Sequence, residues 1–178
     1  LTSAFTANSG RGLYNDPEVI DETVTFRSYG LKKVDDIPFT VVSPTKAVAN
    51  VVVLRGGAPN AWSRKNLPKR VESKVGVVAS RLHFLGGVAG WGYPAVGDDH
   101  LPVLKVTLHF AGGANEEILF RNGQEIADYI GQFDVPKSKG LPQWTRRGQI
   151  RWHSAEVKGT NVIERMTLES FDNHVAPT

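Results

Sequence analysis

Short apolar runs of strand length constrain the fold of this chain more than any other feature. They are rich in β-branched and aromatic residues, and turn residues separate them about every ten positions. The runs cover residues 37–42, 50–54, 77–85, 103–110, 117–120, 149–152 and 162–168. This rhythm is typical of all-β proteins, so we expect an antiparallel β-sandwich.

The run over 103–110 carries the clearest pattern. Its apolar and polar residues alternate without a break: Leu104, Lys105, Val106, Thr107, Leu108, His109 and Phe110. Strict alternation sends one set of side chains to a core and the other to water or to a second layer, as in a strand. A helix does not produce this period.

Two glycine-containing turns follow that run. Gly112-Gly113 and Asn122-Gly123 suit turns that need positive φ. We therefore expect residues 103–130 to form a meander whose last strand covers 126–130. A short helix over 124–129 is the competing interpretation.

The length of 178 residues suits a single domain. Residues 1–35 are rich in Asn, Gly, Asp and Pro, so we expect one β-sandwich domain over 1–178, with 1–35 as an irregular segment packed on it. The chain begins with Leu1, and Met166 is its only methionine. These features predict a region excised from a larger protein, or a processed product.

Composition excludes several kinds of chemistry. The chain has no cysteine, which removes disulfides, thiolate metal sites and a cysteine nucleophile. No apolar run approaches the roughly 18 to 20 residues that a membrane helix requires, so no membrane partner is expected.

Charge is unevenly distributed along the chain. The formal net charge is +3, from 21 basic and 18 acidic residues. Residues 46–81 hold eight basic residues and one acid, Glu72, whereas the remainder holds 13 basic and 17 acidic residues. The small net charge of the whole chain is therefore the sum of a segment of net charge +7 and a slightly acidic remainder.

The segment 82–94 is the most unusual in the chain. A strand leads directly into a glycine-rich loop that carries Trp91 and Tyr93. Glycines let a ligand approach the main chain, and aromatic rings offer flat faces on which a sugar ring can stack. The alternative is that both rings plug the end of the sandwich. Phosphate binding is not expected, since the segment lacks the Lys-Ser/Thr ending of a P-loop.

A second candidate is the polar loop over 55–70. Asn60, Trp62 and Arg64 combine amide, aromatic and cationic groups, which suits an acidic or sulfated sugar. The alternatives are a solvated loop and a single-stranded nucleic acid site. No recognised nucleic-acid motif accompanies the charge, so no nucleic acid partner is expected.

The segment 141–148 repeats the combination of an aromatic residue with arginines. It carries Trp144, expected to be exposed, beside Arg146. If this loop lies at the same end of the fold as the first two, the three form one site.

Catalysis and metal binding find less support. The five histidines lack metal-ligand spacing, and the serines lack a G-x-S-x-G setting. Asp98-Asp99-His100 reads more readily as a solvated turn than as an acid/base group. We therefore expect no catalytic residue and no cofactor. A structural calcium ion is the one metal considered, on oxygen donors near the N-terminus: Asn15, Asp16, Glu18, Asp21 and Glu22.

Several phrases of the sequence together resemble a known family. They are Ile37-Pro38-Phe39, 50–57, 82–94, 106–113, 122–129, 147–151 and 162–169. In order and spacing the chain resembles, from Phe5 onward, the galactose-binding-like β-sandwich modules of large secreted bacterial multidomain proteins, particularly the NPCBM-like carbohydrate-binding type. The most specific parts are 82–94 and 122–129.

The resemblance implies a jelly roll, an extracytoplasmic location, a non-catalytic accessory role and a carbohydrate ligand. It supplies no residue-level binding motif. Similar modules continue past Ala176-Pro177-Thr178 with another strand. The resemblance thus implies an edge that is exposed or filled by a partner segment.

These observations predict a carbohydrate-binding accessory module with a preference for anionic polysaccharide. Stacking on Trp91, Tyr93 and Trp62 would be assisted by polar groups at the rim. The alternative is a structural or interaction domain that docks neighbouring catalytic or cytochrome domains of the same polypeptide and binds no sugar.

Overall fold

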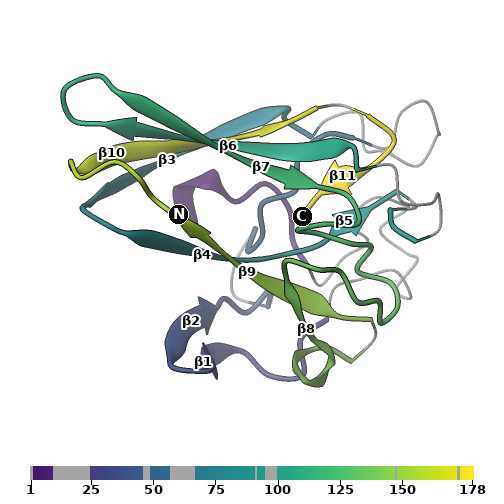
Figure 1. Ribbon diagram of the computed structural model, residues 1–178. Coiled ribbons are helices and arrows are strands. Elements are labelled where there is room, and N and C mark those ends of the chain that lie inside the picture. The colour runs from purple at the N-terminus through teal and green to yellow at the C-terminus, as the bar shows by residue number, and fades with distance from the viewer. Residues whose placement is uncertain are drawn as a thin grey trace.

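Two antiparallel β-sheets face each other in the computed structural model of the chain (Figure 1). The structure describes residues 2–9, 25–45, 49–56, 67–90, 92–94, 100–146, 148–171 and 173–178. Every strand pairing in the sheets is antiparallel, and the only helical segments in these residues are 3-10 turns, η1 (Thr2–Ala4) and η3 (Pro142–Trp144). The expected all-β sandwich is confirmed.

The larger sheet has four strands in the order β3-β10-β6-β7. Their bounds are β3 (Arg70–Val77), β10 (Ile163–Ser170), β6 (Pro102–Phe110) and β7 (Asn115–Arg121). Facing it is a three-stranded sheet in the order β4-β9-β8, with β4 (Arg81–Gly86), β9 (Ile150–Glu156) and β8 (Lys139–Leu141). Two small pairs complete the fold: the hairpin of β1 (Gly30–Val34) and β2 (Ile37–Val41), and the pair of β5 (Val88–Ala89) with β11 (Ala176–Pro177).

The alternation over 103–110 is confirmed in β6. Val106 and Leu108 are fully buried, and they pack between the two sheets with Leu82 and Phe84 of β4. We call this the inter-sheet core. Burying these side chains removes apolar surface from water, which is the main favourable term in folding.

A second core lies on the other face of the three-stranded sheet. Leu85 and Trp152 point to that face, where the β1–β2 hairpin and its neighbours cover them with Val34, Val41 and Trp144. We call this the hairpin core. Because successive residues of a strand point to opposite faces, β4 contributes to both cores.

The expected turn at Gly112-Gly113 is confirmed. It joins β6 to β7, and both glycines have positive φ, 91° and 88°. The expected strand over 126–130 is wrong, as is the competing helix over 124–129. The chain there forms turns and single bridges, Ile126 with Asn122 and Asp128 with Val88, and the Asp128 carboxylate accepts the N–H of Gly92.

Three other expectations need correction. The run 77–85 is not one strand, because the chain turns at 78–80 between β3 and β4. The region 1–35 contains strand β1, which pairs with β2 through a two-residue turn at Asp35 and Asp36. The run 50–54 is extended but joins no sheet; Val51 makes a single bridge with Ala7.

Asn50 ties the N-terminal segment to the rest of the fold. It is buried; its Oδ1 accepts the N–H of Ser9 at 2.7 Å, and its Nδ2 donates to the Ser9 hydroxyl and to the Val42 carbonyl, both at 2.8 Å. One side chain therefore joins the N-terminal segment to the end of the β1–β2 hairpin and to the 49–56 segment.

Replacing Asn50 with alanine should lower the free energy of unfolding by about 1 to 3 kcal/mol, because the buried N–H of Ser9 is left without an acceptor. Urea unfolding followed by far-UV circular dichroism measures this change. The matched control is Asn161→Ala, whose amide is exposed and makes one long hydrogen bond of 3.3 Å to Ala111. Equal effects of the two substitutions would contradict the anchoring role of Asn50.

Candidate functional site

The β5–β11 pair lies at one end of the sandwich and connects two of the predicted loops (Figure 1). Leu54 donates its N–H to the Pro177 carbonyl of β11 at 3.0 Å, and Gly56 lies against the main chain of Val175 and Ala176. On its other side β11 pairs with β5, which leads into the glycine-rich segment. The start of the polar loop thus lies beside the glycine-rich loop.

Asp128 holds the glycine-rich loop in place through hydrogen bonds. Its carboxylate accepts the N–H of Gly92 at 3.0 Å and the N–H of Ile130 at 2.8 Å. Asn122 accepts the N–H of Tyr93 at 2.8 Å, and the N–H of Asp128 donates to the Tyr93 carbonyl at 3.1 Å. Asp128 is only 8% exposed, so burial raises the pKa of its carboxyl above its ordinary value, although both N–H bonds oppose the shift.

Gly92 is a glycine because of packing. A Cβ on this residue would overlap Cγ2 of Val88 and would lie 3.3 Å from Oδ1 of Asn122. The loop can therefore reach Asp128 only without a side chain at this position. This favours the alternative in which this glycine serves close packing rather than ligand approach.

Tyr129 brings the third predicted loop to the same end. It donates its N–H to the Val88 carbonyl at 3.0 Å and accepts the N–H of Gln149 at 3.1 Å. Gly148 packs so closely on the Tyr129 carbonyl that a Cβ would overlap it. The described bases of the three loops therefore lie near one another, which is the condition that a shared site requires.

Trp144 is not exposed, and the expectation of an exposed ring at this position is wrong. The residue is only 7% exposed and belongs to the hairpin core. Phe39 approaches the ring edge-on, with a centroid distance of 6.3 Å, and the ammonium group of Lys32 lies 5.4 Å from its centroid. Burial leaves no free face for a sugar to stack on.

Of the other predicted site residues, two fall in the described part of the chain. Arg146 is exposed. Burial raises the pKa of the nearby Tyr29 above its ordinary value, and the charge of Arg146 opposes part of that shift. Tyr93 is half-buried at the end of the sandwich. Trp91, Trp62, Arg64 and Asn60 lie outside the described residues, as do the calcium donors Asn15, Asp16, Glu18, Asp21 and Glu22.

The basic segment does not form a basic surface where the structure describes it. Its residues in β3 lie on the outer face of the four-stranded sheet, opposite acidic and polar residues of β10 and β6. Arg165 pairs with Glu72 at 2.7 Å, and Lys105 with Glu169 at 3.3 Å. Charged side chains of both signs therefore share this face, among them Arg70, Glu72, Lys74, Lys105, Glu117, Arg165 and Glu169.

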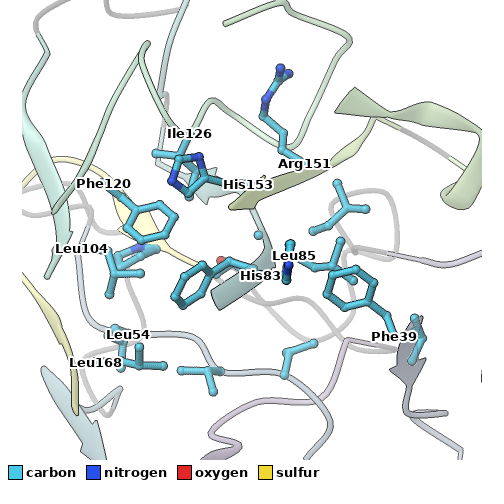
Figure 2. A pocket seen from close by; sticks show the side chains of 18 of the residues that line it. Phe39, Leu54, His83, Leu85, Leu104, Phe120, Ile126, Arg151, His153 and Leu168 are labelled. Atoms are coloured by element: carbon cyan, nitrogen blue, oxygen red, sulfur yellow. The ribbon is translucent and has the colours of Figure 1, made fainter. Parts of the chain in front are cut away.

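Sequence reasoning missed a groove of about 330 Å³ beside the free edge of β4 (Figure 2). Residues of both cores line it, among them Leu104 and Phe120 from one side and Phe39 from the other. No sequence motif predicts this groove, because its walls come from segments far apart in the chain. Ligand pockets are commonly this apolar, with few polar groups.

Arg151 is the most deeply buried charged residue on the groove wall, at 2% exposure. Its guanidinium donates to the carbonyl of Phe133, and to the hydroxyl and carbonyl of Ser138 at 2.7 and 2.8 Å. Burial lowers the pKa of this guanidinium, and Asp134 opposes that shift. The group fastens the 133–138 segment to β9, so its donors are engaged within the protein.

In the described ranges, no three His, Asp or Glu side chains gather closely enough to hold a metal ion. None of the helical segments there is long and apolar enough to cross a bilayer.

Trp144→Ala should destabilise the fold by about 3 to 5 kcal/mol, because a large buried ring is removed and its cavity fills only partly. Urea unfolding monitored by circular dichroism gives the value. A loss below about 1 kcal/mol would contradict the burial of this ring.

Asp128→Asn should lower the free energy of unfolding by about 1 to 3 kcal/mol at pH 7, because an amide can accept only one of the two N–H groups with its single oxygen. The control is Glu164→Gln, which neutralises an exposed carboxylate.

The same pair of proteins tests the pKa of Asp128. A folded-state pKa above the ordinary 3.8 stabilises the fold fully below pH 3.8, and this contribution is lost as the pH rises through the raised pKa. The stability difference between wild type and Asp128→Asn should therefore shrink from pH 4 to pH 7. A difference that grows over this range would contradict the direction of the shift.

Comparison of the chain with protein-family models, with curated proteins and with solved structures found no match. The resemblance to the galactose-binding-like modules therefore stays a prediction.

Proposed function

We propose that the protein is a non-catalytic carbohydrate-binding module that acts with the loops at one end of its sandwich. One observation carries this proposal: hydrogen bonds through Asp128, Tyr129 and β11 bring the bases of three aromatic-bearing and arginine-bearing loops together. A rigid sandwich that presents neighbouring loops is a common platform for binding.

In this proposal Trp91 and Trp62 stack on the sugar, Tyr93 adds a half-buried ring, and the polar groups of Asn60, Arg64 and Arg146 bind hydroxyl or acidic substituents at the rim. Trp144 takes no part, because it is buried. A preference for anionic polysaccharide then depends on the loop arginines, since the cations of β3 lie among acidic neighbours.

The location that suits this role is outside the cytoplasm, next to other domains of the same polypeptide. Nucleic acid and membrane are not the partners we propose. Stacking on a shallow site buries few sugar atoms, so the affinity should lie in the micromolar to millimolar range, about −8 to −4 kcal/mol.

The second candidate is a structural domain that docks neighbouring domains and binds no sugar. The packing of Gly92 and the burial of Trp144 favour it, because both features then need no ligand. The two candidates differ in whether the isolated folded protein binds any polysaccharide.

Calorimetry and affinity electrophoresis against neutral, uronic-acid and sulfated polysaccharides test the proposal. Trp91→Ala and Arg64→Ala should each weaken binding about tenfold or more, which corresponds to about 1.4 kcal/mol. Binding of an anionic glycan should weaken with added salt, since exposed charges are screened over about 8 to 10 Å.

The controls are Val162→Ala and Lys158→Ala, two exposed positions at the opposite end of the sandwich. Absence of binding by the folded wild-type protein over the whole panel would refute the carbohydrate proposal and favour the docking domain. Binding that survives both loop substitutions would move the site elsewhere on the protein.

A further inference from the structure

The groove beside β4 follows a main-chain edge. In the order β4-β9-β8, β4 pairs only with β9, through the register Arg81↔Glu156 to Gly86↔Arg151. Its opposite edge faces the groove, whose wall includes the successive residues Leu82 to Gly86. Figure 2 shows His83 and Leu85 of this strand in the middle of the pocket.

The direction of the free main-chain groups follows from Gly87. Gly87 and Thr178 exchange two hydrogen bonds of 2.9 Å, so the N–H and C=O of Gly87 point away from β9 and toward β11. The main-chain groups of Val88 point in the opposite direction: its N–H donates to the Ala127 carbonyl, and its C=O accepts the N–H of Tyr129. Because main-chain groups alternate in direction along a strand, those of Leu85 and His83 point into the groove.

A second extended segment borders the opposite side of β11. The N–H of Leu54 donates to the Pro177 carbonyl at 3.0 Å, and Val52, two residues earlier, also lines the groove. In the described part of the chain, no main-chain hydrogen bond is made by Val52, or by His83 and Leu85 on their outer side. All three residues are half-buried, so their outer main-chain groups are accessible from the groove and can pair with an added strand.

The side walls of the groove are apolar in both directions. On one side lie Leu104, Phe120 and Leu168 of the four-stranded sheet, and on the other lie Phe39 and Val51 of the hairpin core. A strand placed here would be buried on both faces. Such strands are apolar at nearly every position rather than at alternate ones.

We propose that the groove accepts one extended peptide strand, which continues the line of β11 antiparallel to β4 and is apolar on both faces. The pair Thr178↔Gly87 fixes its register. The second residue beyond that pair then bonds Leu85, the fourth bonds His83, and the opposite edge of the peptide faces Val52. The end of the chain already lies on this line, where Thr178 bonds Gly87 on one side and Pro177 of β11 bonds Leu54 on the other.

A small apolar molecule fits this site less well. It would cover the side chains but would leave the main-chain groups of His83 and Leu85 without partners, at a cost for each buried group. The Nδ1 atom of His83 is also buried without a partner in the described structure. A peptide supplies donors and acceptors at the strand spacing.

A fluorescein-labelled synthetic peptide, with six Val and Ile residues between lysine pairs, tests the proposal with the protein as it stands. Binding measured by fluorescence anisotropy should occur in the micromolar range. The same peptide with N-methyl groups on the residues that face β4 cannot donate to that strand, so it should bind at least about tenfold more weakly.

Amide hydrogen exchange supplies a control within the protein. Saturating peptide should slow exchange at His83 and Leu85 and should leave Phe84 unchanged, because Phe84 already points toward β9. Met166→Lys places a charge in the groove wall and should abolish binding, whereas Val78→Lys, at an exposed position, should not. Circular dichroism establishes that both variants fold.

Unchanged exchange at His83 and Leu85 would overturn the proposal, as would equal binding of the methylated peptide or no binding at about 1 mM peptide. A concentration-dependent dimer that the peptide does not dissociate, detected by sedimentation, would also overturn it by assigning the edge to a second copy of the chain. The polysaccharide experiments are independent of these results, because their variants lie in the end loops.

Discussion

The three-stranded sheet must be covered on both faces, and most of the architecture follows from this requirement. Leu82 and Phe84 point toward the four-stranded sheet, whereas Leu85 and Trp152 point to the hairpin core. A sandwich of two sheets alone would leave the second set in water. The β1–β2 hairpin and the N-terminal segment, fastened by Asn50, remove that surface from water and make the small sheet an interior layer.

The loop end of the molecule depends on one buried carboxylate. Taking a charge from water is costly, and the raised pKa of Asp128 reports that cost. Two backbone N–H groups offset part of it, and in return Asp128 holds Gly92 and Ile130 in fixed positions. A loop that contains several glycines loses much conformational entropy on ordering, so a specific anchor is needed to give it one conformation.

Sequence patterns predicted the strands whose environment differs on their two faces, as for β6, where Val106 and Leu108 are buried and Lys105 lies outside. They failed where a strand lacks this alternation and where the partners of a residue are distant in sequence. Strand β1 carries Lys32 and Lys33 with an exposed Leu31, so nothing local marks it as a strand. Trp144 sits beside arginines in sequence, yet the hairpin buries it, and that contact is visible only in the folded chain.

The arrangement of the end loops could be predicted only in part from the sequence. The pattern predicted that the glycine-rich loop and the 141–148 loop could share a site, and their bases meet at Tyr129. It could not show that Asn122 and Asp128 fasten this end, because an asparagine in a turn and an acid in an apolar run have many other uses. The groove beside β4 could not be predicted either, because its walls come from segments far apart in the chain.

The charged outer residues of β3 also affect how copies of this protein can associate. Arg70, Glu72 and Lys74 project from an edge strand, and such charges make an edge a poor template for pairing with another sheet. The edge of β4 lacks that protection, since apolar side chains flank it. Of these two edges, the charged one of β3 thus disfavours pairing with another chain whereas that of β4 permits it, so an added strand is directed to β4 rather than to β3.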